Sequence, residues 1–146
     1  MQLCILCVGR KARDPLITAT DDYLARLRRH TKVELVRIKD GDTASQTRTL
    51  LAKVVQVERL IALDERGELW TTQQLSDNLR AWQLKGVNRV AFLIGGAGGL
   101  DESLTRRADH VLSLSKMTLP HRLAQVMLAE QLYRAETIIR GAPYHR

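Results

Sequence analysis

Five short apolar runs recur along the chain, separated by segments in which apolar residues return every three or four positions. The runs have the length of strands and cover residues 3–9, 33–38, 59–64, 89–95 and 110–115. Alternating strands and helices are typical of parallel sheets, because each helix carries the chain back to begin the next strand in the same direction. The pattern predicts an α/β fold on one parallel sheet.

Residues that begin and end helices lie between these runs. They are Asp14 and Pro15 for the first helix, Thr71 or Thr72 and Gly86 for a helix through Trp82, and Asp101 for a short helix through Arg107. The last helix is predicted to begin at Pro120 and to run to about Arg140, where Gly141 ends it.

The last helix carries more apolar surface than one buried face requires. One face holds Ala124, Met127, Leu128, Leu132, Ala135, Ile138 and Ile139. Leu123, Val126 and Tyr133 lie elsewhere around the helix. Two interpretations follow, a helix that pairs with its copy in a homodimer and a helix that its own chain encloses completely.

The chain has 146 residues, which indicates one domain over residues 1–146. Its formal net charge of +7 favours a polyanionic partner, either a nucleic acid or an anionic membrane surface. Aromatic residues make up only 4% of the chain, which argues against base stacking as the main mode of binding. No apolar run approaches the ~20 residues of a membrane span, and the start lacks the pattern of a signal peptide, so we expect a cytoplasmic protein.

Both cysteines lie in the first apolar run, as Cys4 and Cys7. Residues three apart in a strand point to opposite faces, and the sequence has no second cysteine pair to complete a zinc site. We therefore predict buried thiols. No other histidine or carboxylate cluster has the spacing of metal ligands, so no metal is expected.

Four glycines lie at the end of the fourth apolar run and just after it, within "LIGGAGGL", residues 93–100. The segment matches neither the phosphate-binding loop nor the dinucleotide fingerprint, because Asp101 stands where the third glycine of that fingerprint belongs. Ligands of open α/β sheets bind at the carboxyl ends of the strands, where this loop begins. A second loop, within residues 112–123, follows the next strand, and we expect the two loops to form one pocket.

Three segments together resemble a known family: "FLIGGAGGL", "LSLSKMTLPHRLAQVMLAEQLYRA" and the terminal "PYHR". They are similar to the RlmH family of SPOUT-class methyltransferases, and the resemblance extends over essentially the whole chain. It implies a C-terminal deep trefoil knot, a homodimer, and transfer of a methyl group from S-adenosyl-L-methionine to N3 of a pseudouridine. The implied substrate is 23S ribosomal RNA within the assembled 70S ribosome.

The resemblance also implies which residues act. The residues that would contact the cofactor are Leu63, Gly95, Gly96, Leu114, Ser115, Lys116, Met117, Thr118 and Leu119. Tyr144, His145 and Arg146 would hold or activate the target base. We expect positioning and electrostatic stabilisation to contribute more than a dedicated base, since a histidine at a chain end is hard to hold in one orientation.

Basic residues near the start of the chain are candidates for RNA contacts, namely Arg10, Lys11, Arg13, Arg26, Arg28 and Arg29. Two other functions stay open from the residues. One is a non-catalytic basic module that binds RNA or the ribosome, and the other is a flavodoxin-like nucleotide-binding protein with an unknotted sheet.

Overall fold

The computed structural model describes residues 1–146 and contains one sheet of five parallel strands in the order β2-β1-β4-β3-β5. The parallel α/β fold predicted from the sequence is confirmed. The strands are β1 (Gln2–Val8), β2 (Lys32–Ile38), β3 (Arg59–Leu69), β4 (Arg89–Ile94) and β5 (His110–Ser113).

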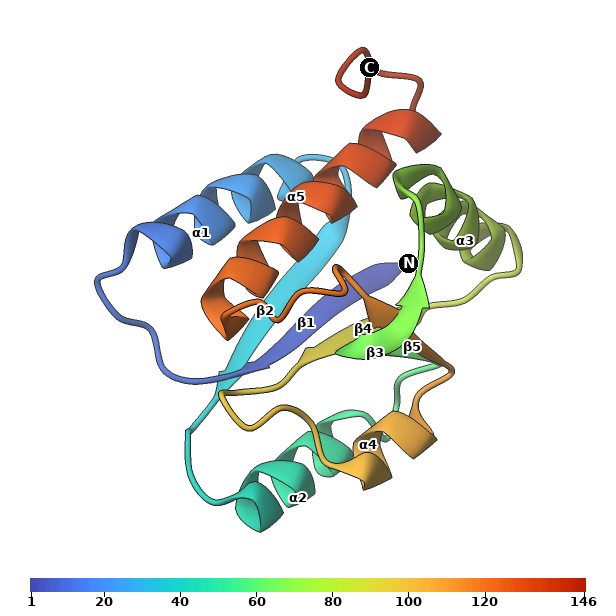
Figure 1. Cartoon of the computed structure of the whole chain (residues 1–146). Helices are drawn as coiled ribbons and strands as arrows, with labels where there is room; N and C mark the ends of the chain where they lie inside the picture. The colour runs from blue at the N-terminus through green and yellow to red at the C-terminus, as the bar shows by residue number, and fades with distance from the viewer.

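Five helices cover the two faces of the sheet (Figure 1). They are α1 (Pro15–Arg28), α2 (Thr43–Lys53), α3 (Thr72–Leu84), α4 (Glu102–Arg107) and α5 (His121–Ile139). Helix α5 packs between α1 and α3 on one face, and α2 and α4 lie together on the other. No helix has the length and apolar character that crossing a membrane requires.

Capping contacts confirm the predicted starts of α1, α3 and α4, while α5 begins after Pro120, as predicted, without a side-chain cap. The Asp14 carboxylate accepts a hydrogen bond from the backbone N–H of Leu16 at 2.7 Å, and Pro15 is the first residue of α1. Thr71, and not Thr72, caps α3, in a reciprocal pair of hydrogen bonds with Gln74. These side chains satisfy backbone donors that the first turn of a helix leaves free, so the loops before α1 and α3 end at fixed residues.

The core consists of two unequal apolar clusters. The larger has 19 buried residues on the face of α1, α3 and α5, and the smaller has nine on the face of α2 and α4. From the predicted core face of α5, Leu128, Leu132 and Ala135 are fully buried. Met127 and Ile138 are only half-buried and do not pack against the larger cluster, so the prediction was wrong for them.

Strand β3 is longer than predicted, because it shifts its register after Leu63 and pairs with β5 a second time through Glu68 and Leu69. The strands approach so closely there that a Cβ on Gly67 would lie 2.4 Å from the carbonyl oxygen of Val111. The shift lifts residues 64–66 out of the regular pairing at the carboxyl edge of the sheet. A polar segment therefore stands beside the loops that follow β4 and β5.

Candidate active site

A cavity of about 390 Å³ lies at the carboxyl edge of the sheet. Its walls are the segment after Leu63, the glycine loop at residues 95–100 and the loop after β5, together with His121 and Ala124 of α5. Strands β4 and β5 each end before their predicted ends, which leaves Gly95, Leu114 and Ser115 free to line the cavity. The prediction that the two loops form one pocket is confirmed.

The glycine loop is a tight turn that folds back on itself. The Gly99 N–H donates to the Gly96 carbonyl at 3.0 Å, and Gly99 has a φ of 75°, which favours glycine. A Cβ on Gly95 would lie 2.5 Å from the carbonyl carbon of Gly99, so no side chain fits there. Nothing lies within 4 Å of a Cβ built on Gly98. The turn therefore presents mostly backbone to the cavity.

Side-chain hydrogen bonds shape the opposite wall. The Ser113 hydroxyl donates to the carbonyl of Ser115 at 2.8 Å, and the Ser115 hydroxyl accepts from the Met117 N–H at 3.0 Å. The Thr118 hydroxyl donates to the carboxylate of Glu65, which joins this loop to the shifted segment of β3. The loop after β5 and the shifted segment of β3, which are far apart in the sequence, thus hold each other in position at the cavity.

Eight of the nine predicted cofactor contacts line this cavity: Leu63, Gly95, Gly96, Leu114, Ser115, Met117, Thr118 and Leu119. Lys116 is exposed and does not line it. Asp64 and Glu65, which were not among the predicted contacts, also line the cavity, as does His121, which the second predicted loop contained. The signal for Asp64 and Glu65 was present, because both carboxylates lie at the carboxyl end of the buried apolar run that begins at Arg59.

Charge at the cavity is set by a local ion pair. Asp64 contacts Arg66 at 3.0 Å, and hydrogen bonds from Arg66 hold the pKa of the Asp64 carboxyl below its usual value. Burial opposes this shift, but it is the smaller effect. Asp64 is therefore an ionised acceptor at the rim, suited to hydroxyl or ammonium groups of a ligand.

A second ion pair connects the cavity to the loop after β1. Arg122, next to His121 at the start of α5, contacts the Asp14 carboxylate at 2.7 Å. Asp14 also caps α1, so one carboxylate links the starts of two helices. The basic loop at residues 10–13 is consequently tethered beside the cavity.

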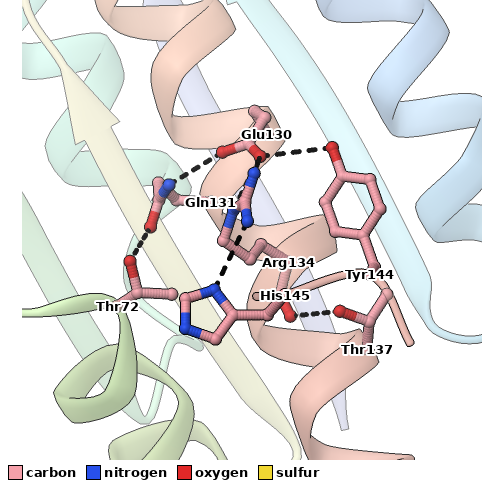
Figure 2. Close-up of polar contacts among 7 residues, drawn as sticks. All are labelled: Thr72, Glu130, Gln131, Arg134, Thr137, Tyr144 and His145. Atoms are coloured by element: carbon pink, nitrogen blue, oxygen red, sulfur yellow. Dashed lines mark hydrogen bonds and ion pairs between the residues drawn. The ribbon is translucent and has the colours of Figure 1, made fainter. Parts of the chain in front are cut away.

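The C-terminal residues lie away from the cavity of their own chain. Tyr144, His145 and Arg146 are absent from its lining, and the tail follows the end of α5 that is opposite to the cavity (Figure 1). Tyr144 and His145 contact Glu130 and Arg134 on α5 (Figure 2). Within one chain, the structure does not bring the predicted catalytic residues to the predicted cofactor residues.

The two thiols have no place in this site. Cys7 is buried, as predicted, while Cys4 is half-buried. Burial raises the pKa of each thiol to about 11, so both remain protonated near neutral pH. No group of three or more His, Cys, Asp or Glu side chains is arranged to hold a metal ion.

The candidate RNA-binding residues differ in their partners. Arg10, Lys11 and Arg13 are exposed, and only Lys11 has an ion pair, a 3.8 Å contact with Asp21. In contrast, Arg26 pairs with Asp22 at 3.1 Å and Arg28 donates to the carbonyl of Val33 at 3.2 Å. Arg29, the residue that ends α1, is exposed and has no ion pair. The free positive charge therefore lies on the loop after β1 and on Arg29, and not on Arg26 or Arg28.

Solved structures share this architecture at low sequence identity. A probable methylase family protein from Haemophilus influenzae matches with a TM-score of 0.63 and 10% identity, covering 99% of this chain and 70% of that one. A probable methyltransferase from Bordetella pertussis gives a TM-score of 0.61 at 12% identity, with 92% and 95% covered. A putative methyltransferase from Legionella pneumophila, solved with the bound cofactor SAM, matches with a TM-score of 0.55 and 13% identity. The match covers 92% of this chain and 66% of that one.

Sequence relatives are much closer. Proteins named ribosomal RNA large subunit methyltransferase H are 46% identical in Paraburkholderia phymatum and Polynucleobacter asymbioticus, covering 100% of this chain and 99% of each relative. The protein of that name from Anaeromyxobacter sp. is 44% identical, with both chains covered completely. Residues 1–145 match the family described as "Predicted SPOUT methyltransferase". The chain therefore belongs to the SPOUT methyltransferases, alongside the relatives named ribosomal RNA large subunit methyltransferase H.

Proposed function

We propose that this protein transfers a methyl group from S-adenosylmethionine to N3 of a pseudouridine in large-subunit ribosomal RNA. The observation that carries the proposal is that the glycine loop and the loop after β5 line one shared cavity. The relatives that match the chain over its full length are named for this class of reaction. Membership of the SPOUT family argues against the flavodoxin-like alternative.

The cavity fits S-adenosylmethionine in size and lining. Its volume of about 390 Å³ lies within the roughly 300–1,000 Å³ typical of small-molecule sites. Leu63, Ile94 and Leu119 supply apolar surface for an adenine ring, and the glycine turn supplies backbone groups. The carboxylates of Asp64 and Glu65 are suited to accept hydrogen bonds from hydroxyl groups of the cofactor.

The bound cofactor supplies a methyl carbon activated by its positively charged sulfur. N3 of the target base would lose its proton to solvent and form a bond to that carbon, while the carbon–sulfur bond would break and leave its electron pair on sulfur. The protein contributes by holding base and methyl group in line, and such positioning can supply about 7–11 kcal/mol of the barrier reduction. Polar groups that face the carbonyl oxygens beside N3 stabilise the charge that develops there.

The position of the tail supports a homodimeric enzyme in which each site takes its tail from the partner subunit. About 20 Å of α5 separates His121, at the cavity, from Arg134, which contacts the tail, at 1.5 Å per residue. No residue of α5 is exposed, but Leu123, Val126 and Met127 are only half-buried and suit an apolar interface. We also propose a single domain over residues 1–146 and a knotted C-terminal region, as the family resemblance implies.

The RNA contact is assigned to the loop after β1. Arg10 and Arg13 are exposed, have no ion pair, and stand on a loop that the Asp14–Arg122 pair holds beside the cavity. Phosphate contacts at this position would guide the base toward the cavity without reading its sequence. The substrate is the assembled ribosome, so the reaction belongs to the cytoplasm.

Transfer of a labelled methyl group to ribosomes tests the proposal. Ribosomes that carry the pseudouridine should become labelled, ribosomes that lack it should not, and mapping should place the label on that base. Label only on another nucleotide or on protein would overturn the substrate. Failure of S-adenosylmethionine to bind at millimolar concentration in calorimetry would favour a non-catalytic RNA-binding module.

A further inference from the structure

The last residues of the chain are held in place, although chain ends usually fray. The ring of Tyr144 lies 4.8 Å from that of Tyr133 and has the guanidinium of Arg134 at 4.7 Å from its centre. The Tyr144 hydroxyl donates to Glu130 at 3.3 Å, and an Arg134 N–H lies 3.3 Å from Nδ1 of His145 (Figure 2). Tyr144 and His145 therefore have defined orientations.

The groups that hold the tail are themselves fixed by a chain of polar contacts. Arg134 and Glu130 form an ion pair at 2.6 Å, and their side chains are only 26% and 17% exposed. Gln131 donates to the other oxygen of Glu130 at 2.7 Å, and Thr72 of α3 donates to Gln131 at 2.7 Å. The chain of contacts runs from α3 through α5 to the tail (Figure 2). Arg134 is thus a rigid partner for His145.

The chemistry of guanidinium determines which nitrogen of His145 carries the proton. Arginine has only donors, so Nδ1 of His145 must accept the hydrogen bond with its lone pair. A neutral imidazole with an unprotonated Nδ1 carries its proton on Nε2. A protonated ring would instead direct an Nδ1–H at the guanidinium, with two positive charges in contact.

We infer that Arg134 holds His145 as the neutral Nε2–H tautomer, which makes the imidazole a hydrogen-bond donor to the target base and not its proton acceptor. The inference rests on the proposed function, in which the tail acts at the base. As the N3 proton leaves to solvent, negative charge spreads to the carbonyl oxygens beside N3, and the Nε2–H of His145 donates to one of them. Arg134 is a positioning residue, since it acts through His145.

Tyr144 follows the same pattern. Its hydroxyl donates to Glu130, and burial together with the charge of Glu130 raises the pKa of the phenol. The phenol therefore stays protonated and does not accept the N3 proton either. The one donor of Tyr144 is directed at Glu130, so His145 is the tail group that donates to the base, and neither group is a general base.

The tautomer can be read directly by nitrogen NMR of the native protein. Long-range proton–nitrogen spectra of the protein labelled with ¹⁵N-histidine should show His145 with its proton on Nε2. The chain has four histidines, so the signal is assigned by its loss in His145→Gln. A proton on Nδ1 in the native protein would overturn the inference, whether or not the enzyme methylates ribosomes.

Turnover of His145 variants tests the role of the proton. Glutamine retains an N–H donor but cannot act as a base, so kcat of His145→Gln should stay within about tenfold of the native value, whereas His145→Ala should lose about a hundredfold. Equal loss in both variants would contradict the donor role. If native protein labels no ribosomes, the proposed function fails, while the tautomer is still decided by NMR.

Arg134→Met should disturb the tautomer signal and lower kcat by about tenfold or more, with little change in S-adenosylmethionine affinity, because Arg134 does not line the cavity. Arg134→Lys should recover part of the loss, since lysine still donates. Arg140→Met is the matched control, because Arg140 lies on the same side of the sheet and pairs with Glu136 at 3.9 Å without contacting the tail. A native His145 signal in Arg134→Met would overturn the positioning role.

Discussion

Gly95 shows how one residue serves both the fold and the site. Because Gly95 has no side chain, the carbonyl carbon of Gly99 can lie 2.5 Å from the position that a Cβ of residue 95 would occupy. The loop folded in this way forms a wall of the cavity. From the sequence, Gly95 was predicted as a cofactor contact by family resemblance. The structure adds a steric reason for glycine there that holds with or without a ligand.

Gly95→Ala should lower the free energy of unfolding by about 1–3 kcal/mol, the range for inserting a methyl group into a packed site, and should weaken S-adenosylmethionine binding. Gly98→Ala is the matched control in the same loop, since its Cβ meets nothing within 4 Å. Thermal unfolding and calorimetry measure the two effects. Equal stability of both variants would show that the loop relaxes around the added methyl group.

At the scale of elements, the starts of α1 and α5 depend on one carboxylate. Asp14 caps α1 and pairs with Arg122, and its pKa lies below the usual value because of the hydrogen bonds from Leu16 and Arg122. A carboxyl whose pKa is lowered by folding stabilises the native state above its unfolded value of about 3.8. This stabilisation is lost as the pH falls through the lower native value.

Asp14→Asn keeps a good helix cap but removes the charge. Its melting temperature should therefore be lower than the native one at neutral pH, and the difference should disappear as the pH falls below 3.8. Asp42→Asn is the control, since Asp42 caps α2 and has no ion pair. A difference that persists in acid would assign the effect to the cap and not to the charge.

How much of this could be predicted differs from element to element. Strands and helix starts follow from local patterns, so β1 was placed within one residue of its observed ends and α1 begins at the predicted Pro15. Helix α2 was not delimited, because only Leu50 of its eleven residues is buried, and the cap at Asp42 was the one clear signal. The second pairing of β3 and the contacts of Tyr144 depend on segments distant in sequence, which no local pattern encodes.

Across the whole molecule, cavity and tail lie at different ends of α5, so the proposed action of the tail at the target base would need the tail of a second chain. Mixing two inactive variants tests this arrangement. Gly98→Phe introduces a bulky side chain on a loop residue that lines the cavity and is expected to block cofactor binding in one chain, which calorimetry checks, and deletion of residues 144–146 removes the tail of the other. Mixed dimers should regain methyl transfer because one intact cavity meets one intact tail. If each tail served its own chain, the mixture would stay inactive.

The charge of the molecule should act mainly through the loop after β1. Arg13→Ala should reduce the slope of log affinity for ribosomes against log salt by about one, as expected for losing one phosphate contact. Arg26→Ala should change the slope less, because Asp22 already pairs with Arg26. Filter binding over a series of salt concentrations measures both slopes, and equal reductions would place the RNA contact on α1 as well.

The unequal core clusters have a consequence for local unfolding. The layer of α2 and α4 rests on nine buried residues and that of α1, α3 and α5 on 19, so amide hydrogens in α4 should exchange with deuterium before those in α5. The glycine loop leads into α4 and the loop after β5 leads into α5. A cofactor bound in the cavity between these loops should bridge the two layers. Saturating S-adenosylmethionine is therefore expected to slow exchange most in α4, the less protected layer.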